Sequence, residues 1–249
     1  MRREYELEVD GVPARAVYDD ECVDGVLVPL LHRWTRMHAE RGCRVVAFLC
    51  APPGTGKTTL ACMLEALSRE RADVDAIQVA SLDGFHLHQS ELESRWAYVG
   101  GERTRLADVK GTLETFDLEG FLAKLGELRA NESVSWPAYS RRIHDVVDDA
   151  LLITGDVVLI EGNWLLSTEG AWEDVAGLAD DTVFVSADSA ELRERLVARK
   201  QRGGLSRAQA ELWYERSDRR NVERLLSHHH AGEVRLRMTQ DGGYVLARA

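Results

Sequence analysis

The feature that most constrains the fold is the stretch APPGTGKTT, residues 51–59, together with the segments on either side of it. Residues 44–50 form an almost unbroken apolar run, RVVAFLC, which is typical of a parallel strand buried on both faces. The apolar residues after the stretch recur at the spacing of one helix face: Leu60, Met63, Leu64 and Leu67. The sequence therefore predicts a strand, a glycine-rich loop and a helix in direct succession.

The loop in this succession has the composition of a phosphate cradle. In such a loop, backbone N–H groups and the helix N-terminus surround the phosphates, a lysine neutralises them, and the hydroxyl after the lysine binds Mg²⁺. Lys57 and Thr58 take the last two roles here. Ala51 stands where the pattern GxxxxGK(S/T) has its first glycine, and a small residue suffices there if its φ angle is negative. We expect the following residues to bind the nucleotide: Pro53, Gly54, Thr55, Gly56, Lys57, Thr58 and Thr59.

Strand-like and helix-like segments alternate along the rest of the chain. Apolar runs predict further buried strands at residues 76–82, 156–162 and 182–186. Helical spacing of apolar residues predicts helices near residues 26–38, 118–128, 189–202 and 206–226. This alternation predicts an α/β fold with a doubly wound, mostly parallel sheet, and small β-hairpins are expected as additions at the two ends of the chain. Residues 87–112 show little periodicity and are expected to form a long functional loop.

Charge and composition narrow the possible partners. The chain has 31 Lys and Arg against 42 Asp and Glu, so its formal charge of −11 opposes binding to nucleic acid or to anionic lipid. No apolar run approaches the roughly 20 residues of a membrane span, and the N-terminal segment lacks the apolar core of a signal peptide. The four cysteines form no CxxC pair, which is typical of reduced thiols in a cytosolic protein. We therefore expect a cytoplasmic protein with no nucleic-acid and no membrane partner.

Two carboxylates follow the other central strands. Asp83 comes directly after the strand predicted at residues 76–82, and Glu161 lies at the end of the strand at 156–162. Ligands of doubly wound sheets bind beyond the carboxyl ends of the strands, so both acids are expected to face the phosphates. A kinase needs one carboxylate to orient or deprotonate the acceptor hydroxyl and another near the Mg²⁺ ion. Asp83 suits the first role and Glu161 the second, although either could merely cap its loop.

Two other features have more than one interpretation. Trp136 could stack on the ring of a ligand or anchor its own segment, and the sequence favours neither. Residues 228–230 are three consecutive histidines, but adjacent side chains on a regular backbone point in different directions. We therefore interpret them as an exposed linker rather than a metal site.

Several longer motifs occur in a fixed order after the loop. They are SLDGFHL at 81–87, KGTLETFD at 110–117, WPAYSRRIHD at 136–145, VVLIEGNWLL at 157–166 and ERSDRRN at 215–221. With the loop, they make the chain resemble the P-loop kinase superfamily that holds phosphoribulokinase, uridine kinase and type I pantothenate kinase. The resemblance is greatest to its bacterial nucleoside/nucleotide kinase, or fructose-kinase-like, group. It covers residues 45–246 and implies a P-loop NTPase fold of the nucleoside-kinase type with a helical lid.

The resemblance implies a role for each residue at a matching position. The catalytic residues would be Asp83 as general base, Lys57 on the phosphates, and Arg195 and Arg199 of the lid. Thr58 and Glu161 would hold Mg²⁺. The acceptor would contact His86, Tyr139, Arg141 and His144, since Tyr139 and His144 reproduce the Tyr-x4-His spacing of uridine kinases. Arg195 and Arg199 are four residues apart and share a helix face, which could also be an ordinary solvated face.

The resemblance also suggests how the chain is organised. We expect one domain overall, in which an N-terminal hairpin and helix, residues 1–43, pack on a P-loop kinase domain, residues 44–249. The lid would occupy about residues 190–208, and a C-terminal hairpin would end the domain. The family suggests a homodimer.

The function expected from these residues is that of a kinase that uses ATP and Mg²⁺. It would transfer the γ-phosphoryl group to a hydroxyl of a small metabolite, with a sugar-like acceptor favoured and a nucleoside or pantothenate-like acceptor next. The main alternative is a P-loop ATPase or switch that couples hydrolysis to a partner's conformation. A repair-type NTPase acting on nucleic acid is opposed by the charge of −11 and by the lack of a basic and aromatic stripe.

Overall fold

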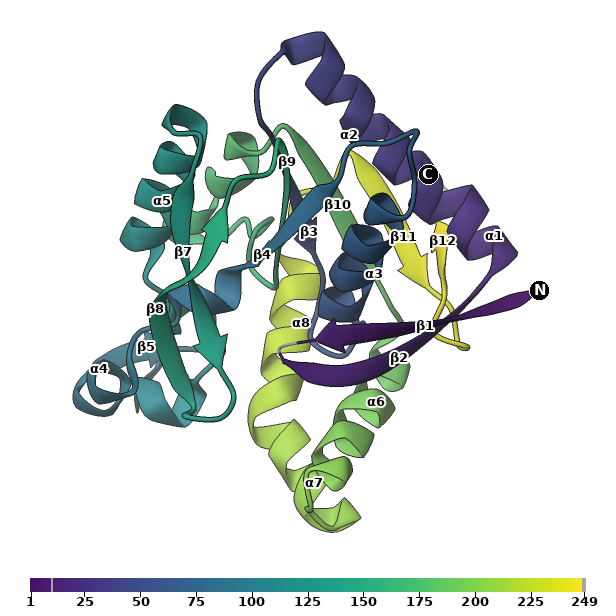
Figure 1. Cartoon of the computed structure of the whole chain (residues 1–249). Helices are drawn as coiled ribbons and strands as arrows, with labels where there is room; N and C mark the ends of the chain where they lie inside the picture. Colours follow the sequence, from purple (N-terminus) through teal and green to yellow (C-terminus); the bar gives the residue numbers. More distant parts are fainter. Residues whose placement is uncertain (10, 248–249) are drawn as a thin grey trace. The chain divides into compact units, whose positions relative to one another are not determined.

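The computed structural model describes residues 1–9 and 11–247, which form two compact units (Figure 1). The first unit combines Met1–Val79 with Gly155–Ala249, and the second is Ala80–Thr154. None of the helices within the described ranges has the length and apolar content that crossing a bilayer demands.

The first unit is built on a six-stranded sheet with the strand order β12-β11-β10-β3-β9-β4. Neighbouring strands from β11 to β9 run parallel, and β12 is antiparallel to β11. Every residue of β3 and β9 is buried, as the unbroken apolar runs predict, so the mostly parallel sheet is confirmed. The strands are β3 (Val45–Cys50), β4 (Ile77–Ser81), β9 (Val157–Gly162), β10 (Asp181–Ser186), β11 (Val234–Met238) and β12 (Tyr244–Leu246).

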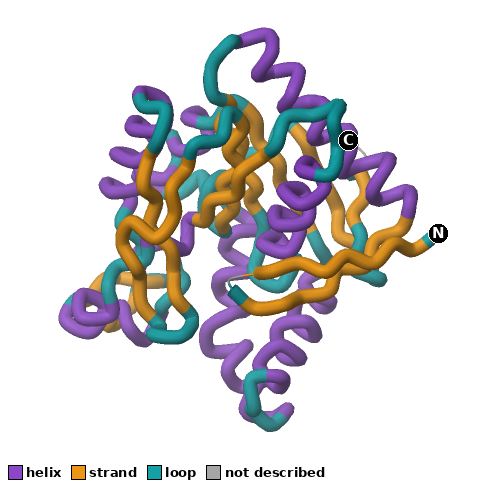
Figure 2. Tube along the Cα trace, viewed as in Figure 1, coloured by secondary structure: helices purple, strands orange, loops and turns teal. Residues whose placement is uncertain are grey.

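Helices cover this sheet, and Figure 2 shows them in purple around the orange strands. Apolar faces of these helices join the strands in a single core. The predicted helix at 206–226 is one continuous helical segment that contains a π turn, Tyr214–Asp218. The predicted helix at 26–38 begins within a π turn, Val23–Leu27, which joins the short helix α1 (Asp20–Cys22) to α2 (Val28–Arg41). The main helices are α2 (Val28–Arg41), α3 (Lys57–Arg69), α6 (Ser189–Arg202), α7 (Arg207–Trp213) and α8 (Arg219–Ser227).

The two terminal hairpins expected from the sequence are present in the first unit. Strands β1 (Arg2–Val9) and β2 (Val12–Asp19) pair antiparallel, with Val9 opposite Val12. Leu7, Ala16 and Tyr18 of this hairpin are buried in the same core as the sheet. Strands β11 and β12 form the second hairpin, in which Met238 pairs with Tyr244.

The second unit contains two hairpins and two helices. Hairpin β7–β8 has an irregular register between Trp136 and Ala138. The prediction of a long loop over residues 87–112 is wrong, because this segment contains a helix and a hairpin of four to six residues per element. Elements this short present too few turns for a periodicity to emerge. The elements are α4 (Gln89–Ser94), β5 (Trp96–Val99), β6 (Glu102–Arg105), α5 (Leu118–Ala130), β7 (Val134–Ser140) and β8 (Asp145–Ile153), with 3₁₀ turns at Leu82–Phe85, Leu106–Val109 and Leu113–Thr115.

An aromatic cluster forms the centre of the second unit. The ring of Phe85 lies edge-on to Trp136 and Phe121, with centroid distances of 4.9 and 5.2 Å. Trp136 is fully buried, and its indole N–H donates to the carbonyl of Ser81 at 3.0 Å. Trp136 therefore anchors its own segment and is not available to stack on a ligand. Gly84 is required beside this cluster, because a Cβ atom there would lie 2.1 Å from the carbonyl oxygen of Pro137.

Candidate active site

The glycine-rich loop joins β3 to α3 and has the geometry of a phosphate cradle. Gly54 and Gly56 have φ angles of +91° and +84°, in the left-handed region that favours glycine. A Cβ atom on Gly54 would lie 3.0 Å from the side chain of Leu196, so the space beside the loop is already filled. Ala51 is buried, and it is not among the non-glycine residues with positive φ. Alanine thus fits the first position of the motif without strain.

Lys57, Thr58 and Glu161 come together at the start of α3. The Lys57 ammonium lies 3.5 Å from one carboxylate oxygen of Glu161, and the Thr58 hydroxyl lies 3.4 Å from the other. The Glu161 side chain is only 2 % exposed, so its charge acts in a medium that screens it weakly. Pro53 and Thr59, also expected at this site, are half-buried in the loop and in the first turn of α3.

The residues present fit a nucleotide with its metal ion. A hydroxyl oxygen and a carboxylate oxygen side by side are the hard ligands that Mg²⁺ prefers in proteins. The helix N-terminus and the lysine beside them supply the positive field that a polyphosphate needs. Within the described residues, no group of three or more His, Cys, Asp or Glu side chains is placed to hold a metal ion, so the candidate Mg²⁺ ligands are Glu161 and the Thr58 hydroxyl.

Two carbonyls of the loop accept hydrogen bonds from side chains far away in the sequence of the first unit. Arg195 of α6 donates from Nε to the carbonyl of Gly54 at 2.8 Å. Tyr244 of β12 donates its hydroxyl to the carbonyl of Thr55 at 2.9 Å. The structure thus brings Arg195 to the loop, whereas Arg199, one turn further along α6, is exposed. Tyr244 was missed by the sequence analysis, since no motif surrounds it.

The residues expected to contact the acceptor belong to the second unit. Asp83 lies two residues beyond the end of β4, half-buried in a 3₁₀ turn, and its backbone N–H donates to the Ser81 hydroxyl at 3.1 Å. The His86 ring stacks on Phe116 at 4.0 Å and meets the Tyr139 ring edge-on at 5.7 Å. His86, which contacts Tyr139, therefore directly follows the turn that contains Asp83.

Lys110 links the remaining expected residues and was not singled out from the sequence as a site residue. Its ammonium lies 4.7 Å from the centre of the Tyr139 ring and donates to the His144 carbonyl at 3.1 Å. His144 has a φ angle of 56° in the exposed turn that joins β7 to β8. Arg141 lies in the same exposed turn. Of the four expected acceptor residues, the structure groups His86 and Tyr139 by their rings, and Lys110 links Tyr139 to the backbone of His144. The side chains of Arg141 and His144 are both exposed.

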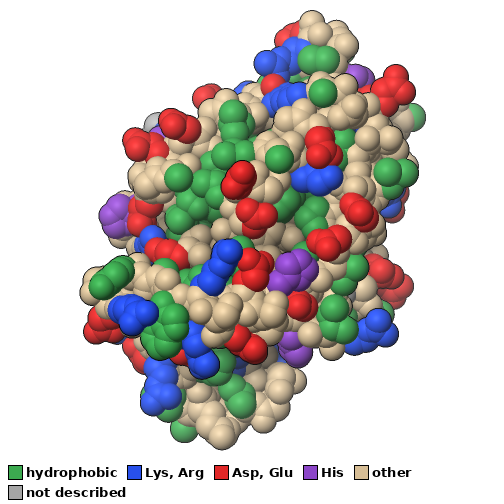
Figure 3. All heavy atoms as spheres, turned by 90° about the vertical axis from the view of Figure 1, so that its left-hand side faces the viewer, with side chains coloured by type: hydrophobic (Ala, Val, Ile, Leu, Met, Phe, Trp, Pro, Cys, Tyr) green, Lys and Arg blue, Asp and Glu red, His purple; other side chains and the backbone are tan. Residues whose placement is uncertain are grey.

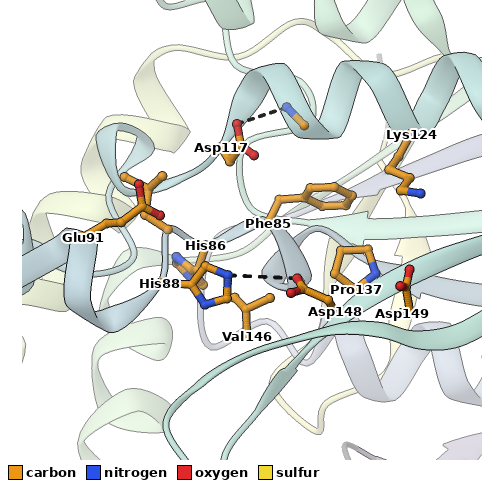
Figure 4. Close-up of a pocket in the computed structure, with 13 residues that line it drawn as sticks. Phe85, His86, His88, Glu91, Asp117, Lys124, Pro137, Val146, Asp148 and Asp149 are labelled. Carbon is orange, nitrogen blue, oxygen red and sulfur yellow. Dashed lines mark hydrogen bonds and ion pairs between the residues drawn. The ribbon is translucent and has the colours of Figure 1, made fainter.

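A hollow of about 210 Å³ opens beside His86 in the second unit (Figure 4). Four carboxylates, one ammonium group and two imidazoles line it, so its charge is negative. Asp83, Tyr139, Arg141 and His144 are not among its lining residues. The ionisable residues in its lining are His86, His88, Glu91, Asp117, Lys124, Asp148 and Asp149.

The three consecutive histidines do not act together. The His229 ring stacks on Phe184 at 3.7 Å, and the His230 ring bonds to the Glu173 carbonyl at 2.8 Å. The expectation of an exposed linker is therefore wrong for His229 and His230, because each finds its own partner in the first unit. His228 alone is exposed.

Comparison with known proteins identifies the family. No family model matches the chain. "Uncharacterized protein YggC" of Escherichia coli is 39 % identical over 240 residues, which cover 96 % of this chain and 97 % of that protein. "Putative uridine kinase C227.14" of Schizosaccharomyces pombe is 30 % identical over 183 residues, covering 72 % and 75 %. The chain belongs to the P-loop kinases of the uridine kinase, phosphoribulokinase and pantothenate kinase type.

A solved structure agrees with this assignment. The crystal structure of a "putative fructose transport system kinase" from Silicibacter sp. TM1040 matches this P-loop kinase with a TM-score of 0.75 and 27 % identity. The match covers 84 % of this chain and 98 % of that one. The α/β P-loop NTPase fold is thereby confirmed. The protein is accordingly an ATP-dependent kinase of small molecules, a phosphotransferase that acts on an alcohol group.

Proposed function

We propose that this kinase transfers the γ-phosphoryl group of ATP to a hydroxyl of a neutral, polyhydroxylated metabolite such as a sugar. The observation that supports ATP as the phosphoryl donor is the grouping of Lys57, Thr58 and Glu161 where the loop meets α3. The observation that favours a neutral acceptor is the excess of carboxylates in the hollow beside His86.

On the donor side, the backbone N–H groups from Gly54 to Thr59 would surround the triphosphate, with Pro53 at the start of the loop. Lys57 would exchange its contact with Glu161 for the phosphates, and Thr58 and Glu161 would hold Mg²⁺. Bound Mg²⁺ would supply charge neutralisation at the β- and γ-phosphates. Arg195, already held at the loop, and Arg199 would stabilise the charge on the transferred group.

On the acceptor side, Asp83 would orient the attacking hydroxyl and accept its proton. His86, Tyr139, Arg141 and His144 would contact the rest of the acceptor. The ring contacts of His86 with Phe116 and Tyr139 support this assignment, because they fix the imidazole beside the hollow. A rigidly held imidazole has nitrogen atoms that can donate or accept, which suits hydrogen bonding with sugar hydroxyls.

The charge of the hollow supports a neutral acceptor. Glu91, Asp117, Asp148 and Asp149 contribute four carboxylates against the single ammonium group of Lys124. A carboxylate or phosphate on the acceptor would be repelled there, whereas the hydroxyls of a sugar or a nucleoside can donate hydrogen bonds to these oxygens. The names of two relatives mention uridine and fructose, both neutral and polyhydroxylated, while pantothenate carries a carboxylate.

The test is ADP release from MgATP, measured over sugars, polyols, nucleosides and pantothenate. We expect stimulation by one or more neutral polyhydroxylated compounds, and none by pantothenate. The variant Asp83→Asn should lower kcat by about a hundredfold or more, because a positioned proton acceptor contributes on that order, with little change in the affinity for MgATP. ADP release that no acceptor stimulates and that Asp83→Asn leaves unchanged would instead indicate an ATPase or switch.

The resemblance to this family leads us to propose two further properties. The kinase is expected to form a homodimer and to work in the cytoplasm. Figure 3 shows one face of the molecule, on which acidic side chains in red are interspersed with basic ones in blue. A surface of this kind, with the net charge of −11, supports a small-molecule substrate rather than a nucleic acid. Sedimentation of the purified protein would test the dimer.

A further inference from the structure

We propose that Tyr244, supported by Tyr18, is a positioning residue that orients the Thr55–Gly56 peptide of the loop for nucleotide binding. The inference rests on the proposed function, because it concerns the same phosphate site. It assigns a role in that site to the terminal hairpins, which otherwise look like additions to the sheet.

The contact between Tyr244 and the loop is direct and buried. The Tyr244 hydroxyl donates to the Thr55 carbonyl at 2.9 Å, across 189 residues of sequence. Tyr244 is 2 % exposed and Thr55 is fully buried. A Cβ atom on Gly56 would lie 3.1 Å from the Tyr244 hydroxyl oxygen, so the phenol sits against the glycine whose N–H group follows the Thr55 carbonyl.

The planarity of the peptide bond transmits this contact to the phosphate side of the loop. In a trans peptide, the C=O group and the following N–H group point in opposite directions. Holding the Thr55 carbonyl on the phenol therefore turns the Gly56 N–H group away from Tyr244 and toward the interior of the loop. Arg195 holds the preceding carbonyl, that of Gly54, in the same manner. Two consecutive peptides of the loop are thus oriented from outside.

A second phenol supports the first. The ring of Tyr18, in the N-terminal hairpin, packs against the ring of Tyr244, and the two ring centres are 6.0 Å apart. Since Tyr244 gives its only hydrogen to Thr55, its oxygen can interact with the Tyr18 hydroxyl only as an acceptor. Burial raises the pKa of both phenols, so both hydroxyls keep their hydrogens throughout the working pH range. The backbone N–H of Tyr244 donates to the Cys22 sulfur at 3.4 Å, which fixes the strand as well.

Loss of the phenol would leave the Thr55 carbonyl without its donor in a buried position. A buried carbonyl without a partner is costly, and rotation of the Thr55–Gly56 peptide would relieve the cost. Gly56 permits such a rotation, because glycine occupies left-handed and right-handed φ values about equally well. The loop would then have to be reordered each time a nucleotide binds, and the nucleotide affinity would fall.

The experiment compares Tyr244→Phe and Tyr18→Phe with the control Tyr5→Phe, which removes a phenol from strand β1 of the same N-terminal hairpin. Calorimetric titration with MgATP gives the Kd without any acceptor, and steady-state assays give both KM values. We expect Tyr244→Phe to raise the Kd and KM for MgATP by about three- to tenfold, the effect of one lost hydrogen bond, and to leave the acceptor KM unchanged. Tyr18→Phe should raise the Kd and KM for MgATP by about twofold, and Tyr5→Phe should leave both values unchanged.

The outcomes separate this inference from the function on which it rests. Wild-type protein that binds no MgATP would overturn both. If the wild type binds MgATP and a folded Tyr244→Phe variant binds it with equal affinity, only the inference is overturned. If Tyr244→Phe does not fold, Tyr18→Phe decides, because it keeps the phenol on Thr55. An unchanged MgATP affinity in Tyr18→Phe would then overturn the inference, and a weakened affinity with an unchanged acceptor KM would support it.

Discussion

The hydroxyl of Thr58 lies 3.4 Å from the carboxylate oxygen Oε1 of Glu161, although 103 residues separate them in the sequence. The pairing of β3 with β9 explains the contact. Glu161 pairs with Leu49, one residue before the end of β3, so its side chain lies beside the start of the loop. One buried carboxylate can therefore reach the hydroxyl of Thr58 and the ammonium of Lys57 at the same time.

This geometry predicts the behaviour of Glu161→Gln. The substitution keeps the shape of the side chain and removes the charge that would attract the metal ion. We expect kcat/KM for MgATP to fall by about a hundredfold, in line with the loss of one charged group at a transition state, and the Mg²⁺ concentration for half-maximal rate to rise. ADP release measured over a series of Mg²⁺ concentrations gives both values. Glu40→Gln, on the exposed side of α2, is the control, and equal Mg²⁺ dependence in the two variants would contradict the role of Glu161.

Two arginines on α6 provide a matched comparison. Arg195 donates to the Gly54 carbonyl, whereas Arg193 forms ion pairs with Glu194 and Glu211 at the helix surface. We expect Arg195→Met to lower kcat/KM for MgATP by about tenfold or more, because it removes a donor to the loop and a charge near the phosphates. Arg193→Met should change it by less than about twofold, since exposed ion pairs contribute little. Similar losses in both variants would show that α6 is needed only for its packing.

The accessible thiol of the kinase can be predicted from burial. Cys43 is exposed, Cys62 is half-buried, and Cys22 and Cys50 are buried. Burial raises the pKa of the Cys50 thiol to about 12, so almost none of it is thiolate at pH 8. A colorimetric disulfide reagent should label Cys43 rapidly in the native protein, and Cys43→Ser should abolish the fast phase. A fast phase that survives in Cys43→Ser would place a reactive thiol elsewhere.

The first unit could be predicted from the sequence because its signals are local. The buried strand before the loop, the glycines at 54 and 56, and the helix after them are consecutive, and each element is long enough to show its period. The acid at the end of β9 could be placed for the same reason, since parallel strands bring their carboxyl ends to one edge of a sheet. Contact between Glu161 and Thr58 follows from that topology.

The second unit and the supports of the loop could not be predicted in this way. In the β5–β6 hairpin, Trp96 and Tyr98 are exposed and pair with arginines, so the alternation that marks a half-buried strand is missing. Tyr244 belongs to a strand of three residues, and its partner is 189 residues away. Lys110 likewise reaches His144 across 34 residues. Contacts of this range depend on the complete fold and leave no local pattern.

Asp218 should make the stability of the kinase depend on pH. It lies at the end of the π turn between α7 and α8, and its Oδ2 atom is buried without a hydrogen-bond partner in the described part of the chain. Burial raises the pKa of its carboxyl, while the charges of Lys200 and Arg199 act in the opposite direction. The folded protein therefore binds the Asp218 proton more tightly than the unfolded chain does.

The sign of the effect follows from this difference. Below the ordinary carboxyl pKa of about 4, Asp218 is protonated in both states and carries no penalty. As the pH rises from there to the raised pKa of the folded state, the unfolded chain releases its proton first, and the folded state becomes less stable relative to it. Asp218→Asn cannot ionise and avoids this loss. In urea unfolding at pH 4 to 7, the free energy of unfolding of Asp218→Asn should rise progressively above that of the wild type. For Asp174→Asn, a substitution at an exposed carboxylate, the free energy of unfolding should follow the pH dependence of the wild type. A constant difference across this range would mean that Asp218 stays ionised in the folded protein, with Lys200 and Arg199 outweighing its burial.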